Sequence, residues 1–511
     1  MGVALPHARR RSAELLAVLS LAADVGFGVP LETGLRVCAL ALALGERCDL
    51  DADELDRVFR LALLRHIGCT AASDEAVAIG GDEIALRSAS PMLDLADKRA
   101  MLPQVLRHVA RTAPPAARPF LLWRMLMSGS AFAEAMAGVC EAATTLAARL
   151  AVPAVTVADL DRYYARWDGK GMVAGAGEEL GRPVLVVQVA ESANAFVQAE
   201  GVDAAAAFVG GHAGTMFAPE PAARFCEDPA SVVGVLDVPS AWDAVLAHAP
   251  DAAAADPGAV FEVLADFADL RSTWFAGHSR GVAALASDAA SRLGLPGDDV
   301  ETLGRAALAH DVGRAAVSAR VWGKEGALTR AEWEQIRLHP YQTERVLSRP
   351  EWLEPVGRLA AAHHERLDGS GYFRGSRDAT PAARVLAAAD VLHALTEPRP
   401  HRKPLPLDEA AGVVRAEARA GRLDGEAVEA VLAAAGAPSR RPERPAGLTP
   451  REVEVLRLLA RGLTKKQIAR ELVVAPKTAD AHVQHIYAKL GVSTRSGATL
   501  FAMRSGLMET I

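Results

Sequence analysis

Two adjacent histidines, His363 and His364, are followed directly by acidic residues and a Gly-x-Gly turn that ends at Tyr372. Packing alone is a poor explanation for such a pair, because imidazole is seldom fully buried without a partner. Two neutral imidazole nitrogens at neighbouring positions are well suited to bind a metal ion. The pair therefore indicates a metal site, provided that other parts of the chain supply further donors.

Further nitrogen and oxygen donors lie on both sides of this pair, and seven of the fourteen histidines fall between positions 278 and 401. The candidate metal ligands are His278, His310, Asp311, His339, His363, His364 and Asp390. This set could hold two borderline metal ions, and Asp311, beside a histidine, suits a bridging ligand. Two ions about 3.5–4 Å apart can share a hydroxide nucleophile and neutralise a phosphoryl oxygen. His393 and His401 have no such neighbours and are predicted to be ordinary surface or pocket residues.

The first half of the chain carries a copy of this pattern without the histidines. Its segment Tyr163–Gly171 contains the same Asp-Gly-x-Gly turn. Matching residues of the two halves lie 245 positions apart near residues 33 and 65, and about 200 positions apart after residue 130. The positions aligned with the seven candidate ligands are Thr33, Arg65, His66, Val139, Tyr163, Tyr164 and Glu191. A metal needs several converging lone-pair donors, so we predict a duplicate that has lost its metal site. The alternative is that an Ala-rich helical sequence produces these matches by chance.

Helices must position these residues, because the chain is rich in Ala and Leu and poor in aromatic residues, a composition that favours helix over strand. Apolar spacing predicts helices in the first half at 12–22, 31–44, 55–67, 132–150, 183–209 and 219–225. It predicts helices in the second half at 281–293, 298–310, 330–348, 353–364, 381–395, 408–419 and 424–435. Loops are expected at 71–91 and at the Pro-rich stretch 113–119.

Length and charge divide the chain further. The 511 residues are too many for one domain, and the net charge of −7 is uneven. Ten Lys or Arg and five Asp or Glu residues from Gly447 onward give that segment +5 and leave −12 for the rest.

The five cysteines form no C-x-x-C pair and are expected to be reduced. Without a signal peptide or a membrane-spanning apolar run, the protein is expected to be soluble and cytoplasmic, with no membrane partner.

Residues 271–436 resemble the HD-GYP domains, a family of metal-dependent phosphohydrolases that hydrolyse cyclic di-GMP. The matching motifs are His310-Asp311-Val312-Gly313, His339-Pro340, His363-His364-Glu365, Asp368-Gly369-Ser370-Gly371-Tyr372 and Ala389-Asp390-Val391. The resemblance implies a helical bundle and a centre of two divalent ions, Fe or Mn, bound by the seven candidate ligands with Asp311 bridging. Arg314 replaces the usual phosphate-contacting Lys, Phe373 replaces the Pro of the Gly-Tyr-Pro motif, and Trp274 replaces the Glu of trinuclear members, so a third ion is not expected.

The C-terminal 64 residues show a helix, turn, helix pattern with excess positive charge, which is typical of DNA binding. Leu448–Leu456, Ile468-Ala469, Lys477-Thr478 and Lys489–Val492 resemble the LuxR-type helix-turn-helix domains. The resemblance implies double-stranded DNA as a partner, a recognition helix within 479–490 and a homodimer formed through about 497–506. The predicted DNA-binding residues are Lys466, Lys477, Thr478, Asp480, Ala481, Gln484, Lys489 and Arg495.

Together these features predict an all-α protein with two HD-type helical domains in tandem and a C-terminal four-helix LuxR-type domain. The expected domains are a degenerate HD-GYP-like copy at 1–245, a metal-bearing copy at 246–436, a Pro- and Arg-rich linker at 437–447 and a DNA-binding domain at 448–511. The predicted function is a transcriptional regulator whose metal-bearing copy hydrolyses a phosphodiester such as a cyclic dinucleotide, with Asp311 and Arg314 as catalytic residues. The alternative is a non-catalytic nucleotide or metal sensor that controls DNA binding.

Overall fold

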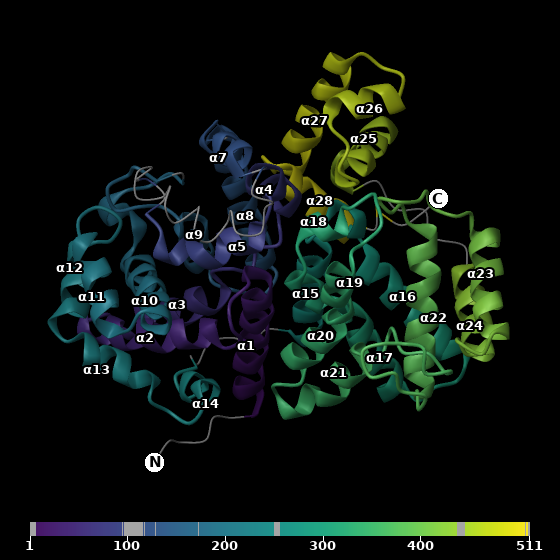
Figure 1. Ribbon diagram of the computed structural model, residues 1–511, viewed down its shortest axis with the longest axis horizontal. Coiled ribbons are helices and arrows are strands. Elements are labelled where there is room, and N and C mark those ends of the chain that lie inside the picture. Colours follow the sequence, from purple (N-terminus) through teal and green to yellow (C-terminus); the bar gives the residue numbers. More distant parts are fainter. Residues whose placement is uncertain are drawn as a thin grey trace. The chain divides into compact units, whose positions relative to one another are not determined.

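Helices make up the regular structure throughout the described part of the chain (Figure 1). The computed structural model describes residues 7–94, 96, 116, 118–127, 129–171, 173–249, 256–436, 445–505 and 507–508. Within these ranges no residue is assigned to a strand, which confirms the all-α prediction. No helix in these ranges is long and apolar enough to cross a membrane. Most of the predicted linker, residues 437–444, lies outside the described residues, as does most of the Pro-rich stretch at 113–119.

The chain divides into two compact units, Met1–Val260 and Phe261–Ile511. The helices of the first unit are α1 (His7–Phe27), α2 (Thr33–Arg47), α3 (Ala52–Leu64), α4 (Ser73–Gly80), α5 (Glu83–Ala89), α7 (Arg118–Met127), α8 (Gly129–Ala148), α9 (Ala154–Arg162), α10 (Arg182–Ala199), α11 (Val202–Gly211), α12 (Pro219–Glu227), α13 (Pro229–Val233) and α14 (Ala241–Leu246). At its centre α2 packs against α3 and α10. The buried faces of α2 and α3 are apolar, with Leu35, Leu44 and Phe59 fully enclosed, so burial of these side chains stabilises the unit.

The prediction of a loop at 71–91 is wrong, because helices α4 and α5 occupy most of this segment. Its Ala, Gly and Ser content suggested irregular backbone, yet the segment has a helix-start signal. The Asp82 carboxylate accepts a hydrogen bond from the Ala85 backbone N–H and caps α5. Ile79 and Leu86 are buried, so the two short helices are held by packing as well as by the cap.

The second unit begins within α15 (Pro257–Asp269) and continues through α16 (His278–Arg292), α17 (Gly297–Ala309), the 3-10 turn η6 (Val312–Ala316), α18 (Ala319–Trp322), α19 (Arg330–Arg337), α20 (His339–Leu347), α21 (Glu354–Ala360), α22 (Pro381–Thr396), α23 (Leu407–Arg419) and α24 (Gly425–Ala435). Helix α16 packs against α17, α22 and α24. Their shared core includes Val282, Leu303, Leu386 and Val428, each at most 1% exposed. This core fixes the helix ends that carry the candidate ligands.

Three predicted helices are shorter than expected, and two of the breaks concern candidate ligands. The helix predicted at 330–348 divides at Leu338, and Pro340, which lacks a backbone N–H, lies in the first turn of α20. The helix predicted at 353–364 ends at Ala360, so His363 and His364 lie in a turn. In the first unit, Gly201 separates α10 from α11 within the predicted 183–209 helix.

The two units share local geometry at matching positions. Helices α2 and α16 begin at 33 and 278 and end at 47 and 292, and α3 and α17 begin at 52 and 297, which is 245 positions apart each time. Asp24 accepts a hydrogen bond from the Gly34 N–H at 3.0 Å, as Asp269 accepts one from the Ser279 N–H at 3.0 Å. This correspondence supports an internal repeat. The predicted domain boundaries at 245, 436 and 447 stay predictions.

The C-terminal helices are α25 (Pro450–Ala460), α26 (Lys465–Glu471), α27 (Pro476–Leu490) and α28 (Arg495–Arg504). Reciprocal capping boxes start α25, between Thr449 and Glu452, and α26, between Thr464 and Gln467. The domain encloses its own apolar core, which contains Leu456, Ile468, Val483, Ile486 and Ala498.

Candidate metal centre and nucleic-acid interface

The candidate ligands come from the ends of separate elements and meet at one place. His278 begins α16, His310 caps the end of α17, Asp311 precedes η6 and His339 begins α20. His363 and His364 follow α21, and Asp390 projects from the interior of α22. All except His364 are at most 3% exposed. Helix ends suit this task, because a side chain there can leave the regular helix surface and point into a shared space.

Asp311 lies between two pairs of imidazoles. Its Oδ2 is 2.8 Å from His310 Nε2 and 3.4 Å from His278 Nε2. Its Oδ1 is 3.3 Å from His339 Nε2 and 3.4 Å from His363 Nε2. Each carboxylate oxygen therefore faces a different pair of ring nitrogens, the arrangement expected of a carboxylate that bridges two cations.

Asp390 closes the centre from the side of α22. Its Oδ1 is 3.2 Å from His278 Nε2 and 3.8 Å from His310 Nε2, and its Oδ2 is 3.8 Å from His364 Nδ1. The structure thus brings all seven sequence-predicted ligands together.

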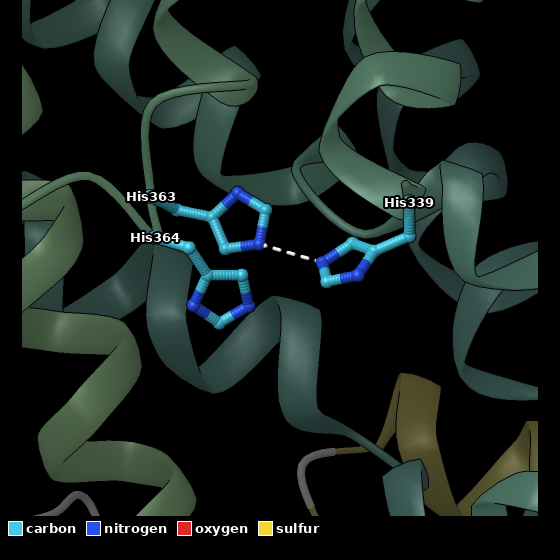
Figure 2. A group of neighbouring side chains, drawn as sticks. All are labelled: His339, His363 and His364. Atoms are coloured by element: carbon cyan, nitrogen blue, oxygen red, sulfur yellow. Dashed lines mark hydrogen bonds between the residues drawn. The ribbon is translucent and has the colours of Figure 1, made fainter. Parts of the chain in front are cut away.

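Backbone hydrogen bonds set the tautomers of three of these histidines. The Nδ1 atoms of His310, His339 and His363 lie 2.6–2.7 Å from the carbonyl oxygens of the residues three positions earlier. A carbonyl oxygen only accepts, so each Nδ1 must carry the proton, and the neutral ring keeps its lone pair on Nε2. Figure 2 shows the consequence: His339 Nε2 and His363 Nε2 face one another at 3.0 Å, joined by the dashed line, with His364 beside them.

Two lone pairs at this distance repel unless a proton or a cation lies near them. Five other buried atoms of the centre that could bind a metal have no hydrogen-bond partner. They are His278 Nε2, His310 Nε2, both carboxylate oxygens of Asp311 and Oδ1 of Asp390. Buried polar atoms are normally satisfied, and leaving one unpaired costs about 1–3 kcal/mol. His339, His363 and His364 form one group with ligand atoms within 4.8 Å of one another, and His278, His310 and Asp311 form another. The donor set therefore fits metal ions, one group on each side of Asp311.

Four of the candidate ligands have protonation states that suit metal binding, whereas, despite burial, the carboxylates around His278, Glu397 foremost, raise the pKa of that imidazole. Burial opposes ionisation of both carboxyls, but Arg314 and neighbouring histidines hold the pKa of Asp311 well below its usual range, and neighbouring histidines alone do so for Asp390. Burial, together with neighbouring histidines, lowers the pKa of His363 to about 4, and the same causes lower the pKa of His364 well below its ordinary value. At neutral pH the carboxyls are charged and these two imidazoles are neutral.

Arg314 lies against the same carboxylate. Its Nη1 is 2.6 Å from Asp311 Oδ2, yet Nη1 and Nε have no partner in hydrogen-bond geometry. Its guanidinium is 4.4 Å from the ring centre of Phe275 and 5.6 Å from that of Trp322, and the residue is 6% exposed. The two aromatic rings hold the cation in place beside the centre, where its free N–H groups can bind an anion.

An aromatic rim adjoins the centre. The Tyr372 ring lies 4.5 Å from His364 and 6.4 Å from Trp333, which is 46% exposed. The Arg337 guanidinium carbon lies 5.6 Å from the centre of the Tyr372 ring. Such flat, partly exposed rings beside a cation suit a planar ligand.

In the C-terminal domain most of the predicted DNA-binding residues lie on α26 and α27. Lys466, Lys477, Thr478, Ala481 and Gln484 are exposed there. Asp480 is half-buried and forms an ion pair with Lys465, which offsets the repulsion that its carboxylate would exert on a phosphate.

Two of the predicted phosphate contacts are engaged inside the domain instead. Lys489 Nζ pairs with Glu452 at 2.7 Å, and the Arg495 side chain donates to the backbone carbonyls of Leu459 and Leu463. We therefore leave Lys489 and Arg495 out of the DNA-contacting set proposed below.

Comparison with known protein families gives a match for the region with the candidate metal centre and another for the C-terminal domain. Residues 262–427 match the HD domain family, and residues 446–502 match the luxR family of bacterial regulatory proteins. The chain contains an HD domain followed by a luxR-family regulatory domain. The chain is 25% identical over 419 residues to 3′3′-cGAMP-specific phosphodiesterase 3 of Vibrio cholerae, covering 78% of this chain and 90% of that protein. It is 34% identical over 178 residues to a cyclic di-GMP phosphodiesterase of Thermotoga maritima, covering 34% of this chain and 48% of that protein.

Among solved structures, the crystal structure of a cyclic GMP-AMP specific phosphodiesterase of V. cholerae matches with a TM-score of 0.54 and 21% identity. The match covers 83% of this chain and 98% of that one. The similarity to this structure shows a shared fold that extends beyond the HD domain into the first half of the chain.

Two functional residues of the HD domain were not identified from the sequence. The His278 Nδ1–H donates to Glu397 Oε2 at 2.9 Å, and His393 Nδ1 lies 3.2 Å from Glu397 Oε1. The prediction that His393 has no arranged carboxylate neighbour is therefore wrong, whereas His401 is an exposed surface residue. The available signal was spacing, because Glu397 follows His393 by four positions, directly after the end of α22. A carboxylate behind a ligating histidine fixes the ring's orientation and raises its basicity.

Replacing Glu397 by glutamine is expected to lower metal affinity about 10- to 100-fold, because the His278 ring loses its anionic partner. Competition with a chelating dye of known affinity measures the change. Glu429→Gln, an exposed position of the same domain that pairs only with Arg415, serves as the matched control. Equal affinities in the two variants would show that Glu397 does not support the centre.

Proposed function

We propose that the HD domain is a two-metal phosphodiesterase for a cyclic dinucleotide, and that the luxR-family domain binds double-stranded DNA under the control of this site. The observation that carries the proposal is the position of Asp311, whose two oxygens face separate pairs of imidazole nitrogens. One ion would be bound by His278, His310, Asp311 and Asp390, and the other by Asp311, His339, His363 and His364. Nitrogen and oxygen donors without sulfur suit Fe or Mn.

Bound ions would supply an activated water and neutralise charge on a phosphoryl group. The protein's own contribution beside them is Arg314. Its guanidinium is buried against Phe275 and Trp322, so it is oriented before a substrate arrives. Its Nε–H has no partner and its Nη1 lies beside Asp311, so the guanidinium can bind phosphate oxygens as charge builds on them. Arginine in place of lysine keeps the charge and adds a second donor.

The rim of Tyr372, Trp333 and Arg337 supports a nucleotide as the substrate. Aromatic faces attract planar bases, and a dinucleotide offers two bases on either side of its phosphates. Proteins with related HD domains carry the names of cyclic di-GMP and 3′3′-cGAMP phosphodiesterases. We therefore propose one of these two cyclic dinucleotides as the substrate.

The test uses the purified full chain loaded with Mn(II) or Fe(II) and incubated with each cyclic dinucleotide. Chromatography is expected to show the linear dinucleotide as the product, and metal analysis is expected to show two ions per chain. Two bound ions without product from either nucleotide would overturn the enzymatic proposal. If the nucleotide still bound, and changed the affinity for DNA, the chain would act as a sensor without turnover.

The exposed lysines of α26 and α27 are expected to bind DNA phosphates. Lys466→Ala and Lys477→Ala should each weaken binding to all duplexes similarly and reduce the slope of log affinity against log salt by about 1, because one counterion fewer is released. Fluorescence anisotropy of a labelled duplex across a salt series measures both effects. Lys403→Ala, an exposed lysine of the HD domain, is the control. Slopes equal to the control would remove these lysines from the interface.

We also propose that the domain dimerises through α28, as LuxR-type domains are expected to.

A further inference from the structure

The first unit contains a cavity of about 190 Å³. Its lining is mainly apolar and is contributed by α1, α5, α8, α10 and the turn after α9. Apolar residues that line it are Phe27, Leu86, Leu93, Phe132, Met136 and Phe217. An apolar cavity of roughly 150 Å³ in another protein stays dry and takes up benzene, so this space is large enough for a small organic molecule.

The cavity lies where the metal centre would be if the two units are copies. Val139, Tyr163, Tyr164 and Glu191 line it, and they align with His339, His363, His364 and Asp390. The surrounding backbone has the same close approach in both units. A Cβ added to Gly68 would lie 2.1 Å from the Val139 carbonyl oxygen, and one added to Gly313 would lie 2.0 Å from the His339 carbonyl oxygen. The two backbones therefore meet in the same way around both sites.

The Glu191 carboxylate at the base of the cavity is surrounded by side chains of the same unit. Glu191 Oε1 accepts from Arg65 Nε at 3.0 Å and lies 2.9 Å from His66 Nε2, while the Tyr163 hydroxyl donates to Glu191 Oε2. The Phe27 ring stacks on His66 at 3.7 Å. In the described part of the chain, every group of side chains suited to a metal lies between 278 and 397. This base therefore closes the cavity without offering a metal site.

Among the cations that line the cavity, Arg87 keeps a buried N–H group without a partner. Arg87 on α5 donates through Nη2 to the Ser73 hydroxyl at 3.1 Å, whereas its Nη1 is buried without a hydrogen-bond partner. No ion pair of Arg87 occurs within the described residues. Glu83, one turn earlier on α5, also lines the cavity but does not pair with it. A buried N–H of a guanidinium is costly to leave unpaired, and an acid group is its strongest partner.

We infer that the first unit binds a small monocarboxylic acid, with its apolar body in the cavity and its carboxylate on Arg87. The apolar walls favour the body, because its apolar surface is removed from water. The guanidinium selects the acid over neutral molecules of the same shape. The duplicated site has thus exchanged metal chemistry for ligand binding, and this inference stands independently of the activity proposed for the HD domain.

The test is calorimetric titration of the full chain with phenylacetate and octanoate, alongside the matched neutral and cationic molecules 2-phenylethanol and 2-phenylethylamine. At least one acid is expected to bind, and at least tenfold more tightly than either 2-phenylethanol or 2-phenylethylamine. Arg87→Gln should weaken acid binding at least tenfold and leave 2-phenylethanol unchanged. Ala135→Phe should fill the cavity and remove binding of all four, while Arg162→Gln, an exposed position of the same unit, should change nothing.

Two outcomes overturn the inference: neither acid binds the full chain, or the acid and the alcohol bind equally and Arg87→Gln has no effect. Because Ala135→Phe replaces a buried residue, its circular dichroism spectrum is compared with that of Arg87→Gln. If only Ala135→Phe is misfolded, the Arg87→Gln result alone decides between the outcomes.

Discussion

Replacing Asp311 by asparagine is expected to reduce bound metal from the proposed two ions per chain to at most one and to lower the proposed phosphodiesterase rate by about 10³-fold or more, a loss of roughly 4 kcal/mol of transition-state stabilisation. An amide keeps the shape of the side chain but offers only one oxygen and no charge. One of the two histidine pairs that face Asp311 therefore loses its shared ligand. Elemental analysis of the purified protein and the rate of cyclic dinucleotide hydrolysis measure the two effects.

A fall in rate has a second possible cause in this variant, which is loss of folding. Asp311 pairs with buried Arg314, and removing one partner of a buried ion pair destabilises a protein. Thermal unfolding of the metal-free forms separates the causes, because an intact fold with one ion and no activity assigns the loss to the centre. Asp378→Asn, an exposed acid of the same domain, controls for the change of net charge. An Asp311→Asn protein that keeps two ions and its activity would contradict the bridging role.

Residue type and spacing were sufficient to find the seven candidate ligands, because histidine pairs and His-Asp neighbours are rare as packing choices. They were not sufficient for Glu397, whose role depends on the contact between the end of α22 and the start of α16. The spacing of His393 and Glu397 indicates a contact between these two residues, but nothing in the sequence points from Glu397 to His278. Lys489 is a second such case, since this basic residue of α27 pairs with Glu452 of α25, and its predicted phosphate contact stays a prediction. Both cases depend on tertiary neighbours far apart in the sequence.

The helix content was predictable from composition, but the helix ends were less so. Alanine-rich segments favour helix over long stretches, but they do not show where a helix ends. The helix breaks at Leu338, just before His339 and Pro340, and after Ala360, where a turn carries His363 and His364. The functional centre is built at these breaks. Local irregularity at a site is expected, since side chains that converge on one point must leave the regular helix surface.

Replacing Gly313 by alanine is expected to destabilise the HD domain by about 1–3 kcal/mol or more and to remove metal from the centre. The new Cβ would lie 2.0 Å from the His339 carbonyl oxygen and 2.8 Å from the Thr343 nitrogen. Both atoms belong to the backbone, so no side chain can rotate away and α20 must move. Thr343 links the strained region to the ligands, because it accepts from the Gly313 N–H and donates to the His310 carbonyl oxygen. Displacement of α20 would carry His339 away from Asp311.

Gly68→Ala provides the matched comparison, because its Cβ would meet the Val139 carbonyl oxygen at 2.1 Å and the Ala143 nitrogen at 2.8 Å. The same clash in a unit without the seven ligands should lower stability and leave the metal content at two ions. Differential scanning calorimetry resolves the unfolding transitions, and elemental analysis gives the metal content. Gly412→Ala, with open space around its Cβ on α23, should be neutral or slightly stabilising. Equal metal loss in Gly68→Ala and Gly313→Ala would mean that the centre depends on the whole chain's stability, whereas loss in Gly313→Ala alone would assign it to the contact between η6 and α20.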